Sequence, residues 1–353
     1  MKQILLAFGL DSSIFEINRF GSGHINDTYL LFSSSTNERF ILQKINTGVF
    51  SNPRIIAKNI YSASQFLNQN HPEYLFIHER KTITGENIFE ENGNYWRLSP
   101  FIKNSYSIDT VSKEEMAFEA AKAFGLFVKN LNGMPLDGLK PSIPDFHNLS
   151  WRYVQFTEAL KKGNADRIKE EAEEIKFFID QKILIKIYEN IISDPNYPTR
   201  MIHHDTKINN VLFNRDTNKS ICVCDLDTLM PGKIISDFGD MVRTYTCAES
   251  EESTNFKNIK IRIPFFKALT KGYLSQLKNL LSVEEKENLF FAGPFMIYMQ
   301  GLRFLTDYLI NDTYYPTKYP KHNLNRAKNQ RLLLVDIFKK EKELREIIDQ
   351  TLK

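Results

Sequence analysis

Residues 201–210 carry the sequence M-I-H-H-D-T-K-I-N-N, in which a His-x-Asp pattern is followed by an asparagine five residues after the aspartate. On a rigid loop, Asp205 could accept the proton of a substrate hydroxyl, and Asn210 could offer a carbonyl oxygen to Mg²⁺, a cation that prefers oxygen ligands. Phosphoryl transfer depends on such positioning and charge neutralisation more than on covalent chemistry. Because the motif also arises by chance in surface loops, its interpretation depends on the sequence around it.

A second acidic segment, I-C-V-C-D-L-D at residues 221–227, follows downstream. Its β-prone run ends at Asp225, 20 residues after Asp205. Kinase-like folds separate the catalytic base from a metal-binding aspartate by about this distance, across one hairpin. We therefore predict that Asn210 and Asp225 hold the metal.

The triplet D-F-G at residues 237–239 imitates the metal-binding motif of protein kinases, but its position argues against that role. It lies 32 residues after Asp205 and begins a predicted helix. We assign Asp237 and Asp240 to holding the catalytic loop or to capping that helix. Adjacent residues do not face one site, so the histidine pair at 203–204 is expected to brace the loop rather than to bind metal.

The chain changes character near residue 102, from short β-prone segments with an Asn-Gly turn to long stretches with helical periodicity. This pattern predicts an α+β, protein-kinase-like fold of two lobes. A small β-rich lobe at residues 1–102 would bind the nucleotide phosphates, and a larger, mainly helical lobe at 103–353 would carry the catalytic loop and the acceptor site. The strands expected are 16–20, 28–32, 39–45, 79–84, 95–102, 210–213 and 220–225, and the helices are 51–70, capped by Ser51, then 113–131, 151–161, 166–192, 256–277, 283–310 and 323–352.

Composition excludes several classes of function. A net charge of +3 over 353 residues is nearly balanced, which argues against a nucleic-acid partner or a membrane surface. No apolar run reaches the roughly 18–20 residues that span a bilayer, and no signal-peptide pattern is present. Three cysteines without a C-x-x-C pair indicate neither a disulfide framework nor a zinc site. We expect a cytoplasmic protein.

The nucleotide site is expected in the β-rich lobe. Gly21, Ser22 and Gly23 lie between two predicted strands, where glycines would let backbone N–H groups approach phosphate oxygens. A plain hairpin turn would have the same sequence. Adenine is expected against the backbone of the connecting segment, at Ser99 and Phe101.

A phosphate-binding cation is expected on the strand at residues 39–45, and Lys44 is the candidate. Side chains alternate between the two faces of a strand, so Gln43 could face the phosphates instead. A solvated lysine on an edge strand is the other interpretation of Lys44.

Seven segments, taken together and in order, resemble bacterial N-acetylhexosamine 1-kinases of the aminoglycoside-phosphotransferase and choline-kinase superfamily. His204 departs from the pattern, because such motifs often carry glycine or asparagine there; we expect this to alter loop packing rather than chemistry. The segments are G-S-G-H-I-N-D-T-Y at 21–29, F-I-L-Q-K-I-N at 40–46, H-x-D-T-K-x-N-N at 203–210, C-D-L-D-T-L-M-P-G at 224–232, D-F-G-D-M-V-R at 237–243, L-R-F-L-T-D-Y-L at 302–309 and H-N-L-x-R-A at 322–327.

The resemblance implies that ATP, with Mg²⁺, phosphorylates the anomeric hydroxyl of GlcNAc or GalNAc, with Asp205 as base and Asp225 as metal ligand. The partner would be a small-molecule sugar substrate, with the protein a monomer or a simple homodimer. The sugar-binding residues are then expected to be His24, Asp205, Asp227, Arg303, Tyr308 and Tyr314.

The residues alone leave alternatives open on the substrate side. Arg303 and Asp307 share a helix face, so they could bind sugar hydroxyls or form an intrahelical ion pair. The tyrosines at 308, 314 and 315 could stack on a sugar ring or fill the core. The same chemistry could act on another sugar, an amino alcohol or an aminoglycoside. A kinase-like binding module without turnover is disfavoured, because both carboxylates and the metal-site asparagine are present.

Overall fold

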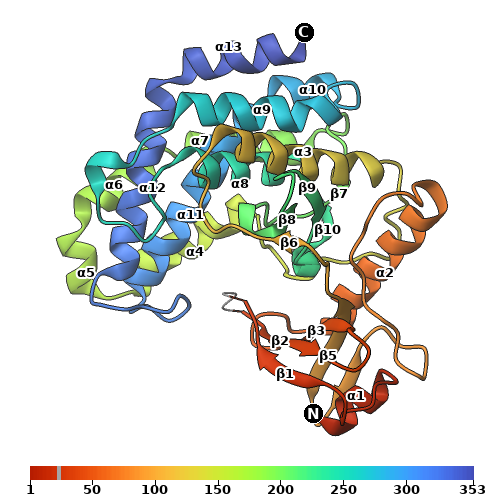
Figure 1. Cartoon of the computed structure of the whole chain (residues 1–353). Helices are drawn as coiled ribbons and strands as arrows, with labels where there is room; N and C mark the ends of the chain where they lie inside the picture. The colour runs from red at the N-terminus through yellow and green to blue at the C-terminus, as the bar shows by residue number, and fades with distance from the viewer. Residues whose placement is uncertain (22–24) are drawn as a thin grey trace. The chain divides into compact units, whose positions relative to one another are not determined.

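The computed structural model describes residues 1–21 and 25–353, which form two compact units. The first is built on an antiparallel sheet and the second on helices (Figure 1). This confirms the predicted α+β, kinase-like fold with a small β-rich lobe and a larger helical lobe. The first unit comprises Met1–Tyr106, Asn130–Pro144 and Leu212–Pro231, and the second comprises Ser107–Lys129, Asp145–Val211 and Gly232–Lys353.

The sheet of the first unit has the strand order β1-β2-β3-β5-β4, with every neighbouring pair antiparallel. The predicted turn at Asn92 and Gly93 joins β4 to β5, and both residues have the positive φ that such a tight hairpin requires. A short three-stranded sheet, β6-β8-β9, completes the unit. The strands are β1 (Glu16–Arg19), β2 (Asp27–Phe32), β3 (Arg39–Ile45), β4 (Phe89–Glu91), β5 (Asn94–Pro100), β6 (Ser105–Tyr106), β8 (Val211–Asn214) and β9 (Ser220–Val223).

One face of the five-stranded sheet packs on α1 (Lys2–Ala7) and closes a hydrophobic core with Leu31, Leu42, Trp96 and Leu98. Helix α2 (Pro53–Asn70) follows β3, as predicted. Its expected cap at Ser51 is wrong: the N-cap residue is Asn52, without a side-chain hydrogen bond. Pro53 in the first turn favours the start instead, because its fixed φ suits a helix.

The predicted strand at residues 79–84 is also wrong, because that segment is irregular. Its backbone N–H groups donate to three different partners rather than along one strand: Arg80 to Leu98, Thr82 to Glu86 and Ile83 to Ala7. The strand that pairs across the Asn-Gly turn is β4.

Helix α11 is the centre of the second unit and packs against α4, α8 and α12 (Figure 1). A Cβ atom at Gly239 in α8 would clash with the backbone carbonyl of Ala292 in α11, so the D-F-G glycine serves close helix packing. The elements are α3 (Glu114–Asn130), α4 (Leu149–Lys162), α5 (Ala165–Glu170), α6 (Ala172–Asp180), α7 (Ile183–Ser193), β7 (Arg200–Ile202), η1 (Ile208–Asn210), α8 (Ile235–Thr246), η3 (Phe256–Asn258), α9 (Ile263–Leu277), α10 (Val283–Glu287), α11 (Ala292–Leu309), α12 (His322–Lys339) and α13 (Glu341–Leu352), with η2 (Leu226–Thr228) and β10 (Met230–Gly232) at the end of the last stretch of the first unit.

Four predicted long helices are shorter or interrupted. The stretch 166–192 breaks into α5, α6 and α7, with the breaks at Glu171 and at the polar pair Gln181 and Lys182. The stretch 283–310 divides into α10 and α11, and residues 288–291 between them belong to neither helix. Helix α9 begins late, and the C-terminal stretch divides at Lys340.

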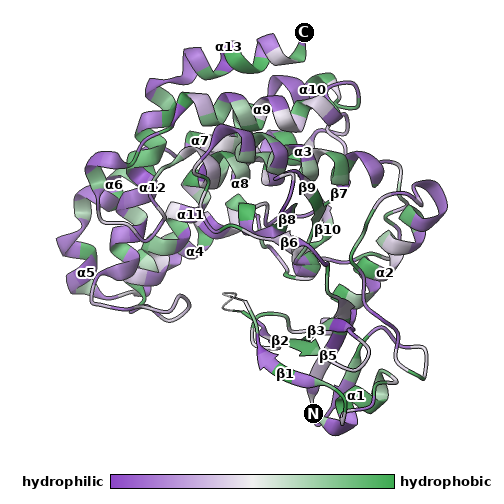
Figure 2. Cartoon of the chain, viewed as in Figure 1, coloured by the Kyte–Doolittle hydropathy of each residue, from purple (hydrophilic) through white to green (hydrophobic). Residues whose placement is uncertain are grey.

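The last helix shows the amphipathic pattern that the sequence predicts. Figure 2 shows hydrophilic and hydrophobic residues alternating along α13, and its buried residues Leu344, Ile347 and Ile348 follow helical spacing. Among the described residues, no helix combines the length and the apolar character that a membrane span needs.

Candidate active site

The loop that carries Asp205 is held by two carboxylates from α8. Asp237 accepts hydrogen bonds from the backbone nitrogens of His203 (3.1 Å) and His204 (2.7 Å), and Asp240 accepts one from that of Thr206 (2.9 Å). Of the two predicted roles for these aspartates, holding the loop is therefore confirmed. Burial raises the pKa of Asp237 to about 6, although the nearby His203 opposes the shift.

The two histidines of the motif brace this loop, as expected. The His203 ring is buried, packs edge-on against Phe124 at 5.2 Å between centroids, and accepts a hydrogen bond from the Asp205 backbone nitrogen (3.3 Å). His204 has a φ of 66°, the left-handed region that favours glycine or asparagine. Its ring occupies the space that a Cβ at position 232 would take, which explains the glycine there.

Asp205 is ionised at neutral pH. Burial would raise its pKa, but the charges of Lys207 and His203 outweigh burial and hold the pKa below its ordinary value. The Lys207 ammonium lies 3.2 Å from Asp205 Oδ1. Asn210 Nδ2 donates to Asp205 Oδ2 at 3.2 Å and to its backbone oxygen at 2.9 Å. The Asn210 carbonyl oxygen is therefore the end of the amide directed away from Asp205, and an oxygen of this kind suits Mg²⁺.

Lys207 was not among the predicted site residues, although the motif contains a signal for it. It stands two residues after Asp205, and on this loop that spacing brings its ammonium to the carboxylate. Arg243 was also missed. It is buried between Asp240 (3.0 Å) and Glu251 (2.6 Å), so it neutralises the carboxylate that holds Thr206.

The second acidic segment lies in the first unit, directly after β9. Asp225 has φ 57° and ψ 64°, a left-handed conformation that aspartate tolerates better than most residues. Asp227, two residues on, accepts a hydrogen bond from Asn26 Nδ2 (2.6 Å) and pairs with Arg97. Its carboxylate therefore anchors the segment of Asp225 to the sheet, and its predicted contact with sugar stays a prediction.

Arg97, on β5, is the centre of a buried polar network in the first unit. Its guanidinium pairs with Asp227, lies 3.8 Å from Glu79 and donates to Gln43 Oε1 at 2.9 Å. Gln43 therefore faces this network. Lys44 lies on the opposite face of the sheet, where Asp27 is its cross-strand neighbour. The cation on the Gln43 face is Arg97, and it was missed because pairing between strands β3 and β5 depends on register.

Glu79 makes this network sensitive to pH. Burial raises its pKa from 4.5 to about 7, although Arg97 opposes the shift. Because the pKa is higher in the folded protein, the contribution of Glu79 to stability is fully present below about pH 4.5 and is lost as pH rises through about pH 7. We expect the variant Glu79→Gln to lose less stability than the wild type between about pH 5 and about pH 8. Urea unfolding at several pH values measures this, and parallel pH profiles for the two proteins would contradict it.

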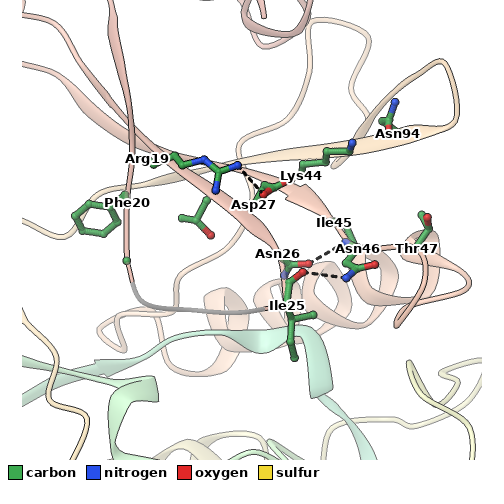
Figure 3. A pocket seen from close by; sticks show the side chains of 12 residues that line it. Arg19, Phe20, Ile25, Asn26, Asp27, Lys44, Ile45, Asn46, Thr47 and Asn94 are labelled. Atoms are coloured by element: carbon green, nitrogen blue, oxygen red, sulfur yellow. Dashed lines mark hydrogen bonds and ion pairs between the residues drawn. The ribbon is translucent and has the colours of Figure 1, made fainter. Parts of the chain in front are cut away.

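Two of the predicted nucleotide-binding residues, Gly21 and Lys44, line one cavity of about 560 Å³ in the first unit. Figure 3 shows Arg19 pointing toward Asp27 in its wall, where the two side chains form an ion pair of 3.4 Å. Ser22, Gly23 and His24 lie outside the described residues. Ser99 pairs with Ile41 in the β3–β5 ladder, and the Phe101 backbone nitrogen donates to the Arg39 carbonyl, so both residues take part in the pairing of two inner strands. Their contact with adenine stays a prediction.

The predicted substrate residues of the second unit separate into two groups. Arg303 and Tyr314 line a second cavity, of about 520 Å³. Tyr308 is buried outside that lining, with the Arg167 guanidinium 4.4 Å from its ring centre, as the core interpretation requires. Among the described residues Arg303 and Asp307 form no ion pair, so that alternative is wrong.

No three His, Cys, Asp or Glu side chains of residues 1–21 and 25–353 form a cluster that could hold a metal. The predicted magnesium site needs no such cluster, because Mg²⁺ in phosphoryl-transfer sites is held by one or two carboxylates together with substrate phosphates. Carboxylate and amide oxygens of Asp225 and Asn210 have the chemistry for this role.

The fold and the site together define a kinase-like phosphotransferase. The fold has a small antiparallel sheet and a helical lobe, and the site has an ionised aspartate beside an asparagine on a braced loop. Residues 16–258 match the phosphotransferase enzyme family, and the chain belongs to that family.

Three solved structures show the same fold. An aminopropanol kinase associated with a microcompartment is 13% identical (TM-score 0.64, covering 98% of this chain and 97% of that one). An ethanolamine kinase from Plasmodium vivax is 14% identical (TM-score 0.59, 93% and 87%). A spectinomycin phosphotransferase in complex with ADP and its antibiotic is 14% identical (TM-score 0.53, 99% and 96%). At sequence identities this low, the similarity to these structures shows a shared fold and nothing more.

Proposed function

We propose that this protein is a sugar 1-kinase that uses ATP and Mg²⁺ to phosphorylate the anomeric hydroxyl of an N-acetylhexosamine, GlcNAc or GalNAc. The observation that carries the proposal is the ionised Asp205 on a loop fixed by Asp237 and Asp240, with Asn210 bonded to it. The seven sequence segments that resemble N-acetylhexosamine 1-kinases give the acceptor class.

Each residue then has a defined task. Asp205 accepts the acceptor hydroxyl's hydrogen bond, orients its oxygen for attack and takes up its proton. Asn210 and Asp225 would hold Mg²⁺, and this metal would neutralise the charge of the γ-phosphoryl group that ATP donates. The proposed nucleotide-binding residues are Gly21, Ser22, Gly23 and Lys44, together with the backbone at Ser99 and Phe101. His24, Arg303 and Tyr314 contact the sugar.

An ADP-release screen over free monosaccharides tests this proposal. We expect ADP only when MgATP and GlcNAc or GalNAc are both present, and a product that has lost its reducing end and shows an anomeric phosphate by phosphorus NMR. The 1-O-methyl glycoside of GlcNAc, whose anomeric oxygen is blocked, is the matched control and should release no ADP. A product that keeps its reducing end would show that the phosphate is transferred elsewhere on the ring.

Amino alcohols and aminoglycosides belong in the same screen, because the structurally similar enzymes are named for such acceptors. Phosphorylation of choline, ethanolamine or spectinomycin in preference to every sugar would keep the phosphotransferase chemistry and replace the acceptor. No ADP release with any acceptor would favour a binding module.

A further inference from the structure

The 520 Å³ cavity of the second unit lies between α4, α11 and the segment that follows α11. Arg152 from α4 and Arg303 from α11 both line it, together with Tyr314 and Tyr315. The Arg303 guanidinium lies 5.4 Å from the ring centre of Tyr315 and 6.0 Å from that of Tyr314. The wall therefore combines two arginines, and Lys162, with aromatic rings that could support a sugar ring.

Within the described part of the chain, no carboxylate lies close enough to either arginine to form an ion pair, and Asp145 acts on Arg152 only as a weaker, more distant charge. Neither Arg152 nor Arg303 forms an ion pair with any carboxylate of the described residues. Arg152 donates to Gln155 Oε1 (2.9 Å) and to the Phe146 carbonyl (3.2 Å), but its Nε atom is buried without a hydrogen-bond partner. Burial, followed by the charge of Arg303, lowers the pKa of Arg152 to about 10. Two uncompensated cations therefore share one partly buried wall.

The acidic residues of the cavity do not offset this charge. Glu158 is ion-paired with Lys161 and Lys162, each at 2.9 Å. The Asp307 carboxylate is buried and accepts hydrogen bonds of 2.8–2.9 Å from the backbone nitrogens of Thr313, Tyr314 and Tyr315. It is further bonded to Asn323. An ammonium group in this cavity would meet two guanidinium groups and no available carboxylate.

A continuous set of side-chain contacts joins this wall to the catalytic loop within the second unit. The Arg303 guanidinium lies 5.6 Å from the Phe146 ring, Phe146 stacks on His147 at 4.3 Å, and the His147 ring is 5.5 Å from that of His204. His204 directly precedes Asp205. Burial and then the charges of His204, Arg303 and Arg152 lower the pKa of His147 well below its ordinary value, so His147 adds no charge. Arg303 in the cavity wall is thus linked to the catalytic loop through the rings of Phe146 and His147.

We infer that this cavity selects the acceptor by charge: Arg152 and Arg303 admit neutral, oxygen-rich or anionic hydroxyl compounds and reject acceptors that carry an ammonium group. Arg152 is then a specificity-determining residue. The inference rests on the proposed function in that it takes this cavity as the acceptor site. It separates the chain from enzymes of the same fold whose named acceptors are amines.

The acceptors GlcNAc and glucosamine test the inference, since they share every hydroxyl and differ only at C2, where glucosamine carries an ammonium group in place of the neutral acetamido group. For the wild type at a pH where the glucosamine amine is protonated, we expect kcat/KM for glucosamine to be at least about tenfold lower than for GlcNAc. Arg152→Gln should bring the kcat/KM values for glucosamine and GlcNAc closer together, and Arg152→Glu should reduce the ratio between them further. The change should appear mainly as a lower KM for glucosamine. Arg345→Gln, in an exposed ion pair on α13, is the control and should leave the ratio unchanged.

The outcomes distinguish this inference from the proposed function. If GlcNAc is phosphorylated but both Arg152 variants keep the wild-type ratio while folding normally, the sugar kinase stands and the charge selection is wrong. If no sugar is a substrate but another neutral hydroxyl compound is preferred over choline and ethanolamine, the sugar assignment fails and charge selection holds. The wild-type ratio needs no variant to fold, and a ratio near one would overturn the inference by itself.

Discussion

Replacement of Asp205 by asparagine should lower kcat by about 10²–10⁴-fold while leaving nucleotide affinity nearly unchanged, which is the usual effect of removing a catalytic base. Asparagine keeps the size of the side chain and can still accept the hydrogen bond from Asn210. It cannot take up a proton, and it removes the negative charge that faces the Lys207 ammonium at 3.2 Å. The loss should therefore fall on turnover rather than on binding.

The measurement is ADP release at saturating MgATP and acceptor, with nucleotide affinity determined separately by calorimetry. Asp180→Asn, at an exposed aspartate of α6 in the same unit, is the matched control and should retain wild-type turnover. Unchanged turnover in Asp205→Asn would remove Asp205 from the mechanism. Loss of nucleotide affinity together with a lower melting temperature would instead show that Asp205 maintains the loop.

The sequence predicted the framework well where a local pattern determines structure. Strand β3 has the predicted bounds, since its run of apolar residues at 40–42 is β-prone, and the Asn-Gly turn forms because both residues tolerate positive φ. Helix α2 begins at Pro53 for a similar local reason. Such features need no information about distant parts of the chain.

Predictions failed where tertiary packing determines the outcome. The segment 79–84 has strand-like composition, but its N–H groups find separate partners, one of them the end of α1. The stretch 166–192 has helical composition throughout, yet it forms three short helices, of which α6 and α7 bury apolar side chains and α5 buries none. Propensity alone does not report which surface each segment must cover.

The candidate site shows the same division. Asp205, Asn210 and Asp225 were predicted as site residues because their spacing within two motifs is typical of phosphoryl-transfer sites, and these roles stay predictions. Arg97 and Arg152 could not be identified in this way. Arg97 is important because it binds carboxylates from two separate segments of the chain. Arg152 is important because it lines the cavity without an ion pair to any carboxylate of the described residues.

Arg97→Met should lower the stability of the first unit by about 3–5 kcal/mol, the typical effect of removing one partner from a buried ion pair. Methionine fills much of the arginine volume, so the loss comes from charge rather than from a cavity. Asp227 and Glu79 would remain buried without their cation, and Gln43 Oε1 would lose its donor. Both carboxylates must then be desolvated without compensation or take up protons.

Urea unfolding of the variant can be followed through Trp96, which is buried in the core of the same sheet. The second tryptophan, Trp151, lies in the other unit and is 44% exposed, so a Trp151→Phe background isolates the signal. Arg54→Met is the matched control: Arg54 pairs with Glu90 at 2.8 Å on the exposed surface of the first unit, where such pairs contribute about 0.2–1 kcal/mol.

A double variant makes the cause testable. Adding Asp227→Asn to Arg97→Met removes one of the uncompensated charges, so it should restore part of the lost stability, as charge removal does at buried pairs. Since Asp227 anchors the segment that contains Asp225, both variants should also raise the Mg²⁺ concentration needed for half-maximal turnover. A loss for Arg97→Met no larger than that for Arg54→Met, or no recovery in the double variant, would show that the network does not hold this segment in place.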